Sequence, residues 1–550
     1  MKEQLIQQRK SFWETNPYFD VNTRAEVASL NHADEIKERF CTDLEFGTGG
    51  LRGIMGAGTN RINRYTVRKA TAGLAMYLKN TVEGEINVAI AYDSRNHSAE
   101  YAKETALTLC SYGIRAHLFS YISATPLLSF AVHHLKCDAG VVITASHNPK
   151  EYNGYKVYGS DGCQAVPHIA DGIIAEVNAI DDITRINPIL EDTAREKALL
   201  FDIGEDVLNA FVDAVLLQTT KQERNLKIVY TPLHGAGRMP VQKALSRLGY
   251  AVTTVPEQEE PDGDFSTVES PNPENHEALA MAVSLAEKEN ADIVLGTDPD
   301  SDRVGVAVRT QNGFEYLTGN QIGALMANYL LETRDCDWTK KILVKTVVTN
   351  DLGAEIARRK GVEIRNTLTG FKYIGEQMEK MKVGQFFMGY EESYGYLVGT
   401  HARDKDAVVS SVIICEMAAY YKHVGKTLID VMGELYEEYG YYLDALDSFT
   451  LKGIEGMEKI KSIMEYFRTE GKDLFTNVTE VLDYAEGIDG LPKSDVLKFC
   501  FADGSWLAIR PSGTEPKIKV YYSVVGTNMD TCFELLKCYR EEISITIKES

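Results

Sequence analysis

Residues 291–308 read ADIVLGTDPDSDRVGVAV, with an apolar run on each side of a short acidic loop. Continuous apolar and β-branched runs of this length are typical of strands buried inside a sheet. Elsewhere the apolar residues recur every three or four positions, which indicates helices. Strand-like runs occur at 86–92, 140–144, 227–230, 291–296 and 342–348, and helix-like runs at 276–289 and 407–422. The alternation predicts an α/β protein, whose ligand-binding loops follow the ends of the strands.

The length of 550 residues is enough for several domains, since one domain holds about 100–200 residues. The helical pattern of 181–200, which contains Pro188, suits a connection between a first and a second domain. Five acidic residues and two prolines predict that 256–264 is a solvated loop. We therefore predict four domains, at residues 1–205, 206–320, 321–440 and 441–550.

The charge of the chain narrows the range of partners. Its 58 Lys and Arg residues stand against 80 Asp and Glu residues, a net charge of −22 at pH 7. Nucleic acids and anionic membranes need basic surfaces, so neither is expected as a partner. The chain has no apolar stretch long enough for a membrane helix, no apolar core near its first residue, and no C-x-x-C pair among its nine cysteines. These features predict a cytoplasmic protein with reduced thiols, in which local basic groups hold any anionic substrate.

The first motif is TASHNP, residues 144–149, which directly follows the apolar run GVVI. A serine at this place, Ser146, can project its hydroxyl from the end of a sheet. A plain strand-terminating turn is the alternative, because Ser, Asn and Pro all favour turns. His147 can tune the serine or simply form hydrogen bonds that support the loop.

The second motif is DPDSDR, residues 298–303. Its carboxylates at alternate positions, Asp298, Asp300 and Asp302, can converge on one hard cation such as Mg²⁺ or Ca²⁺, which would relieve their mutual repulsion. A solvated acidic turn is the alternative, but the apolar runs on both sides favour a buried loop. An EF-hand is excluded, because its sixth and twelfth positions would be Arg303 and Arg309. We therefore predict a metal site.

A third loop, GYEESYG at 389–395, is a candidate for sugar binding. Carboxylate and hydroxyl groups such as those of Glu391 and Ser393 can bind neighbouring sugar hydroxyls. Downstream, Arg403 and Lys405 can attract phosphate. A tyrosine-rich loop that packs on a neighbouring element is an equally good interpretation of this segment alone.

A fourth loop, RPSGTEPK at 510–517, offers hydroxyl and backbone N–H groups together with the charges of Arg510 and Lys517. Such a loop is typical of a phosphate site. The glycine-rich stretch GTGGLRG at 47–53 is not a dinucleotide-binding sequence, because Arg52 occupies the place of the last glycine in G-x-G-x-x-G. No G-x-x-x-x-G-K-[ST] sequence occurs either, so a nucleotide ligand is not predicted.

Taken together and in this order, the four loops resemble the signature loops of the α-D-phosphohexomutase superfamily, the phosphoglucomutases and phosphomannomutases. The resemblance extends from Gly47 to Lys517. It implies three mixed α/β domains and a smaller C-terminal α+β domain around a central cleft. In chain order the domains would supply a phosphoserine loop, a metal-binding loop, a sugar-binding loop and a phosphate-binding loop. The stretch FGTGGLRG and the length resemble the longer branch, which holds phosphoglucomutases and phosphopentomutases.

The resemblance also implies a role for each matching residue. Ser146 would carry the phosphoryl group, and Lys156 matches a lysine often proposed as the general acid/base. His147, which lies next to Ser146 in the sequence, is the second candidate for this base. An oxygen of phosphorylated Ser146 and the three aspartates of DPDSDR would bind Mg²⁺. The implied substrate-binding residues are Arg52, Asp302, Arg303, Thr369, Gly370, Glu391, Ser393, Lys405, Arg510, Ser512, Gly513, Thr514 and Lys517.

The activity that the resemblance implies is interconversion of glucose 1-phosphate and glucose 6-phosphate. It would proceed through a phosphoserine enzyme and glucose 1,6-bisphosphate, the intermediate and activator. The partner would be a small-molecule sugar phosphate, and the sequence does not indicate an oligomeric state.

Two positions depart from the family pattern: Gly49 replaces the usual serine of GTSGLR, and Lys150-Glu151 follow TASHNP. Ser393 favours a hexose, because phosphopentomutase-like members often carry alanine there. Phosphopentomutase and phosphomannomutase activities stay as alternatives. A Mg²⁺-dependent sugar phosphatase would not need RPSGTEPK, and an inactive sugar-phosphate sensor would not need Ser146.

Overall fold

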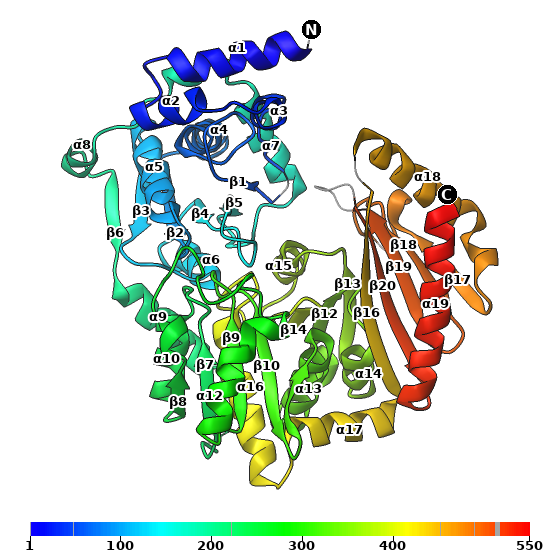
Figure 1. The fold of residues 1–550 in the computed structure, drawn as a ribbon. Helices are drawn as coiled ribbons and strands as arrows, with labels where there is room; N and C mark the ends of the chain where they lie inside the picture. The colour runs from blue at the N-terminus through cyan, green and yellow to red at the C-terminus, as the bar shows by residue number, and fades with distance from the viewer. Residues whose placement is uncertain are drawn as a thin grey trace. The chain divides into compact units, whose positions relative to one another are not determined.

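Figure 1 shows the fold as a computed structural model, which describes residues 2–47, 49–221, 223–451, 453–488, 490–511 and 517–549. These residues form four sheets of six, five, four and five strands, with helices between the strands, so the α/β prediction is confirmed. Internal contacts divide the chain into two compact units. The first unit comprises Met1–Thr318, Phe371–Gly389 and Ser393–Gly425, and the second unit comprises Gly319–Gly370, Tyr390–Glu392 and Lys426–Ser550. The predicted domain boundaries and the central cleft stay predictions.

The first sheet lies in the first unit and has the strand order β1-β5-β4-β2-β3-β6. Its central strands β2, β3 and β4 run parallel, whereas β5 is antiparallel to β4 and β1. Every residue of β4 is buried, and helices α5 and α6 both pack against it, which explains the continuous apolar run. The elements are β1 Leu51–Ile54, α4 Arg64–Thr81, β2 Asn87–Tyr92, α5 Ser98–Ser111, β3 Arg115–Phe119, α6 Thr125–His134, β4 Ala139–Ile143, β5 Tyr152–Gly159, α7 Pro167–Asn178, α8 Glu191–Glu196, β6 Leu200–Ile203 and α9 Glu205–Leu216.

Three helices precede this sheet and share a small aromatic core. They are α1 (Lys2–Thr15), α2 (Val21–Ala28) and α3 (Ala33–Phe40). The Trp13 ring stacks on Phe19 with centroids 4.3 Å apart, and both are fully buried beside Phe40 and Tyr65. Because Tyr65 belongs to α4, this core attaches the N-terminal helices to the first sheet.

The second sheet, also in the first unit, has the order β11-β10-β9-β7-β8. β9 runs parallel to β7, and β10 follows it as an antiparallel neighbour, so the acidic loop Asp298–Arg303 is the tip of a hairpin. Burial of β9 and most of β10 matches the two apolar runs of the sequence. The elements are β7 Lys227–Thr231, α10 Arg238–Arg247, β8 Ala251–Thr254, α11 Pro256–Glu259, α12 Ala280–Lys288, β9 Ile293–Thr297, β10 Val304–Thr310 and β11 Gly313–Leu317. The first unit also contains α15 Phe371–Glu379, α16 Ala407–His423 and β15 Gly395–Val398, a strand that is not part of the second sheet.

Three local predictions are wrong in part. The stretch 181–200 is not one helix, because only a 3₁₀ turn at Ile183–Arg185 and the short α8 form around Pro188. The stretch 256–264 begins with the helical turn α11, in which the Gln258 side chain is buried and accepts a hydrogen bond from Thr231. The helix predicted at 276–289 starts as a 3₁₀ turn before α12.

The second unit contains the parallel pair β12–β13 and a five-stranded antiparallel sheet of order β16-β20-β19-β18-β17. This last sheet, with helix α19 packed on β16 and β20, is the predicted smaller C-terminal α+β domain (Figure 1). The elements are α13 Gly319–Thr333, β12 Ile342–Thr346, α14 Leu352–Arg359, β13 Glu363–Thr367, α17 Leu428–Tyr439, β16 Tyr441–Thr450, α18 Gly453–Leu474, β17 Val478–Asp483, β18 Leu497–Phe501, β19 Trp506–Pro511, β20 Lys517–Gly526 and α19 Met529–Glu549; β14, Phe386–Glu391, ends in this unit. Among the described residues, none of the helices combines the length and the apolar character that crossing a membrane requires.

A buried charged cluster joins the two sheets of the second unit. Lys345 forms an ion pair with Asp351 at 3.0 Å, and Trp506 donates to Asp351 at 3.0 Å. Lys498 donates to the Val347 carbonyl oxygen at 2.9 Å and lies 3.9 Å from the centre of the Trp506 ring. Burial, with the charge of Lys345 as the next cause, lowers the pKa of Lys498 to about 8.

Lys498→Met is expected to change how stability depends on pH. The pKa of lysine is about 10.4 in an unfolded chain, so between about pH 8 and 10.4 the unfolded wild type binds the proton that the folded one releases. The free energy of unfolding of the wild type should therefore rise, relative to Lys498→Met, by up to about 3 kcal/mol across this range. Urea unfolding at several pH values measures the difference, with the exposed Lys461→Met as the control. A difference that stays constant with pH would contradict the prediction.

Candidate active site

Ser146 lies in the loop that follows β4, at the carboxyl end of the parallel strands. Its φ of +51° is in the left-handed region, which costs a residue other than glycine about 1–3 kcal/mol and persists only where the surroundings enforce it. The Ser146 N–H donates to Thr144 Oγ1 at 2.8 Å, and the Asn148 N–H donates to the Ala145 carbonyl oxygen at 3.1 Å. The loop is thus a tight turn at the end of a strand, which was the alternative interpretation of this motif. It also holds Ser146 in an enforced backbone conformation.

The hydroxyl of this serine points at the acidic loop. Ser146 Oγ donates to Asp298 Oδ2 at 2.6 Å and lies 3.2 Å from His147 Nδ1. Burial, reinforced by the charges of Arg303 and Arg52, holds the pKa of His147 well below its ordinary value. His147 is therefore a neutral imidazole near pH 7, beside a hydroxyl bonded to a carboxylate.

The three aspartates of DPDSDR converge as predicted. One oxygen of each lies within 4.8 Å of the others, and all three residues are buried. Backbone N–H groups of Asp302 and Arg303 donate to Asp298 Oδ1, both at 3.0 Å, which holds the hairpin tip in place. Oδ1 of Asp300 and Oδ1 of Asp302 are buried without a hydrogen-bond partner among the described residues. Buried carboxylate oxygens that converge and lack donors fit a hard divalent cation.

Two lysines offset part of this negative charge. Lys156 Nζ, from β5, lies 2.9 Å from Asp300 Oδ2, and Lys405 Nζ lies 3.1 Å from Asp302 Oδ2. Burial and the neighbouring carboxylates raise the pKa of Asp298 well above its usual value. Burial would also raise the pKa of Asp300, but the charge of Lys156 and the side-chain hydrogen bonds of Asp300 together outweigh burial, so the pKa of Asp300 is lowered. The predicted acid/base Lys156 is thus part of the acidic centre.

Two predicted arginines also lie beside the serine and metal loops. Arg52, on β1, donates to Asn148 Oδ1 of the serine loop at 3.2 Å. Arg303 follows the last aspartate and is ion-paired with Glu274. Ser393, half-buried in the turn before β15, belongs to the same unit.

The other predicted residues that the structure describes lie in the second unit. The Gly370 N–H donates to Glu391 Oε1 at 2.8 Å, and Thr369 Oγ1 is buried without a hydrogen-bond partner among the described residues. Arg510 is the last residue but one of β19, and Lys517 begins β20. Ser512, Gly513 and Thr514 lie outside the described residues.

Three residues that touch these loops were not predicted from the sequence. Thr125 Oγ1 donates to Asp300 Oδ2 at 2.9 Å, and Asp93 and Arg95 contact the serine loop. Thr125 precedes Pro126 at the start of α6, which is an ordinary helix start and gave no signal. Asp93 and Arg95 follow the buried strand β2. The serine and metal loops also follow buried strands, so this position was a signal that could have identified both residues.

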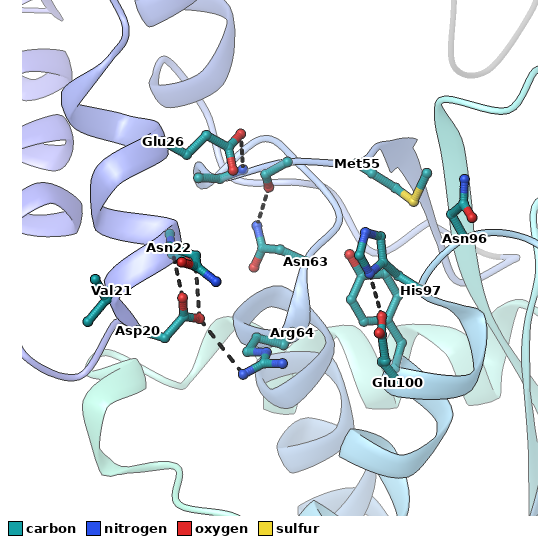
Figure 2. Close-up of a pocket in the computed structure, with 14 residues that line it drawn as sticks. Asp20, Val21, Asn22, Glu26, Met55, Asn63, Arg64, Asn96, His97 and Glu100 are labelled. Atoms are coloured by element: carbon teal, nitrogen blue, oxygen red, sulfur yellow. Dashed lines mark hydrogen bonds and ion pairs between the residues drawn. The ribbon is translucent and has the colours of Figure 1, made fainter. Parts of the chain in front are cut away.

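A cavity of about 870 Å³ lies elsewhere in the first unit, lined by α2, the residues after β1 and the start of α5 (Figure 2). Arg64 faces Asp20 with 3.8 Å between charged atoms, and His97 pairs with Glu100. None of the predicted site residues lines this cavity. The cavity is therefore separate from the residues predicted to form the site.

The chain matches the phosphoglucomutase/phosphomannomutase family in four successive parts. These are α/β/α domain I at residues 43–184, α/β/α domain II at 207–313, α/β/α domain III at 318–439 and the C-terminal domain at 465–526. A phosphoglucomutase of Staphylococcus epidermidis is 38% identical over 516 residues, which cover 90% of this chain and 94% of that protein. A phosphoglucomutase of Staphylococcus aureus strain MSSA476 is 38% identical over 514 residues, covering 90% and 92%.

Solved structures show the same fold. A phosphoglucomutase/phosphomannomutase family protein from Burkholderia thailandensis has a TM-score of 0.69 at 18% identity, covering 92% of this chain and 98% of that one. The open form of parafusin, a phosphoglucomutase from Paramecium, has a TM-score of 0.71 at 18% identity, covering 92% and 95%. The predicted architecture of three mixed α/β domains and a smaller C-terminal domain is confirmed. The chain belongs to the phosphoglucomutase/phosphomannomutase family.

Proposed function

We propose that the chain catalyses the phosphoglucomutase reaction, the interconversion of glucose 1-phosphate and glucose 6-phosphate. The enzyme is an intramolecular phosphotransferase, like the phosphoglucomutases to which it is 38% identical over 90% of its length. One contact carries the proposal: Ser146 Oγ donates to Asp298 Oδ2 at 2.6 Å, inside a buried triad of carboxylates. A serine so placed can hold a phosphoryl group against a bound cation.

The reaction we propose uses Ser146 as the carrier of the phosphoryl group. The group passes from Ser146 Oγ to the free hydroxyl of the bound sugar phosphate, whose proton goes to a base, and the product is glucose 1,6-bisphosphate. The bisphosphate then turns over and returns its other phosphoryl group to Ser146 Oγ, which releases the isomeric monophosphate. The same bisphosphate would activate an enzyme whose serine is not phosphorylated.

The donor set supports Mg²⁺ as the metal. Asp298, Asp300 and Asp302 would hold it, and an oxygen of phosphorylated Ser146 would be a further ligand. Carboxylate oxygens are the ligands that Mg²⁺ prefers, and the triad provides two, Asp300 Oδ1 and Asp302 Oδ1, that accept no hydrogen bond from any residue the structure describes. When bound, Mg²⁺ supplies positive charge that stabilises the oxygens of the transferring phosphoryl group.

Two residues are placed to exchange the proton. His147 is held neutral, 3.2 Å from Ser146 Oγ, and can accept a proton from a hydroxyl. Lys156 reaches the same centre from β5, where its ammonium is paired with Asp300. We propose both as candidates for the general acid/base, a function that contributes about 10²–10⁴-fold to the rate.

The other predicted residues would bind the sugar phosphate. In our proposal Glu391, Ser393, Thr369 and Gly370 contact sugar hydroxyls. Phosphate would be held by the loop that contains Ser512, Gly513 and Thr514 and by five cations. These cations are Arg52, Arg303, Lys405, Arg510 and Lys517. A chain of net charge −22 needs such a local collection of cations for an anionic substrate. We further propose that each of the domains 1–205, 206–320, 321–440 and 441–550 supplies one loop, and that the protein is cytoplasmic.

A comparison of substrates tests the choice of sugar. A coupled assay should give a kcat/KM for glucose 1-phosphate at least about tenfold above that for mannose, ribose or deoxyribose 1-phosphate, because hydroxyl-reading groups are left unpaired by the wrong sugar. Ser393→Ala should narrow the difference between hexose and pentose. Equal or higher rates on the pentose phosphates would overturn the assignment to glucose.

A further inference from the structure

The side chain of Arg95 is completely buried and contacts the backbone of the serine loop. Its guanidinium donates to the carbonyl oxygens of Pro149 at 2.8 Å and Tyr152 at 3.1 Å, and also to those of Ser146 and Asn148. All four carbonyl groups belong to residues 146–152, which comprise most of the segment that joins β4 to β5 and the first residue of β5. One side chain therefore fixes this segment at four points, including the peptide that follows Ser146.

Asp93 extends this arrangement to the other side of the serine. It accepts hydrogen bonds from Thr144 Oγ1 at 2.6 Å and Ser98 Oγ at 2.7 Å, and its Oδ2 lies 3.3 Å from Arg95 Nε. Thr144 Oγ1 in turn accepts the bond from the Ser146 N–H at 2.8 Å. Ser146 is therefore tied on its N–H side to Asp93, through Thr144, and on its carbonyl side to Arg95.

The chemistry of the two residues suits this position. A guanidinium presents five donors in a fixed plane and can reach several carbonyl oxygens at once, which an ammonium on one nitrogen cannot do with the same geometry. The Phe265 ring lies 4.9 Å from the guanidinium carbon and covers one face of the plane. Both charges are buried, and burial opposes the ionised form of each, so each residue needs the other as its partner.

We propose that Arg95 and Asp93 are positioning residues that hold Ser146 in its left-handed conformation, with Oγ directed at the acidic triad. The proposal rests on the proposed function, in which Ser146 carries the phosphoryl group. Both residues act through the backbone of the loop. Without them the turn at Ser146 is free to relax to an ordinary backbone conformation, and Oγ then no longer points at the acidic triad. A misplacement of about 1 Å is enough to slow such a transfer by about 100-fold.

The test compares Arg95→Lys with a matched control, Arg309→Lys. Arg309 also donates to backbone carbonyl oxygens, those of Ala286 and Ala291, and stacks on a phenylalanine at 4.7 Å, but it lies outside the site. In Arg95→Lys we expect kcat with glucose 1-phosphate to fall about 100-fold and KM to stay within about threefold, because positioning affects the transfer step. Phosphorylation of the dephosphorylated enzyme at Ser146 by glucose 1,6-bisphosphate, followed by intact mass, should slow in parallel. Arg309→Lys should keep the wild-type kcat.

Two further variants keep the proposal testable if Arg95→Lys folds poorly. Thr144→Val keeps the shape of the side chain and removes the link from Asp93 to the Ser146 N–H, so its kcat should fall at least about tenfold at unchanged KM. Guanidinium ion added to folded Arg95→Ala should restore part of the lost kcat. A wild-type kcat in Arg95→Lys, or a loss that only follows the folded fraction seen by urea unfolding, would overturn the positioning role. Failure of the proposed function itself is distinct, because it appears as turnover that survives in Ser146→Ala.

Discussion

Replacing Ser146 with alanine should lower kcat for glucose 1-phosphate by about 10⁴-fold or more, because no other group can then carry the phosphoryl group. The side chain shrinks by one oxygen atom at a 3% exposed position, so the fold should survive. The acidic triad keeps its geometry, and stabilisation by Mg²⁺ should persist. A coupled assay of purified protein, with thermal unfolding in Mg²⁺ and in chelator, measures both effects.

The control for this variant is Ser410→Ala. Ser410 is a fully buried serine in the same unit, and its hydroxyl donates to the Asp406 carbonyl oxygen one helical turn earlier, at 2.6 Å. Its loss should leave kcat close to the wild-type value. Near-wild-type turnover in Ser146→Ala would contradict the phosphoserine mechanism and the proposed function with it.

Asp298→Asn should abolish turnover and also make the metal-free protein more stable at pH 7. Burial and the charges of Asp300 and Asp302 raise the pKa of Asp298, so its ionised form is unfavourable without a cation. The stability of the wild type relative to Asp298→Asn should therefore fall as pH rises above about 4, the unfolded pKa of aspartate. Thermal unfolding in chelator at several pH values measures this trend.

The same variant should lose its response to Mg²⁺. At Mg²⁺ concentrations about 100-fold above Kd, the wild type should gain about 2.7 kcal/mol of stability, and Asp298→Asn should gain little. Asp292→Asn is the control, because Asp292 precedes β9 in the same segment but pairs with Lys422 outside the triad. An equal gain in Asp298→Asn and the wild type would place the metal elsewhere.

The parts of the fold and site that the sequence predicted are those encoded locally. The strands β9 and β10 and the aspartates between them lie within one stretch of 18 residues, where apolar runs and alternate carboxylates can be read directly. Ser146 follows a buried strand in the same way. The turn at 256–259 was missed because its acidic composition indicated solvent, whereas Gln258 turns inward to bond Thr231.

The contacts that join these loops could not be predicted, because they depend on how distant strands pair. Asp93 meets Thr144 only because β2 and β4 are parallel neighbours, which brings the two strand ends to one edge of the sheet. The ion pair of Lys156 with Asp300 spans 144 positions of sequence. The motifs showed which side chains have suitable chemistry, and the pairing of the strands determines which of these side chains are in contact.

The hairpin that carries the acidic triad has a consequence for the order of folding. The pairing of β9 with β10 and the hydrogen bonds within the loop between them are local, so the loop can form early, on the microsecond timescale typical of hairpins. Ser146 and Asp298 are 152 positions apart, and closing so long a loop reduces the chain entropy before any contact between its ends can offset the loss. We therefore expect the acidic tip to be assembled while the serine is still mobile. Substitutions at the tip should change the folding rate, and substitutions that weaken the serine's contacts with it should mainly change the unfolding rate.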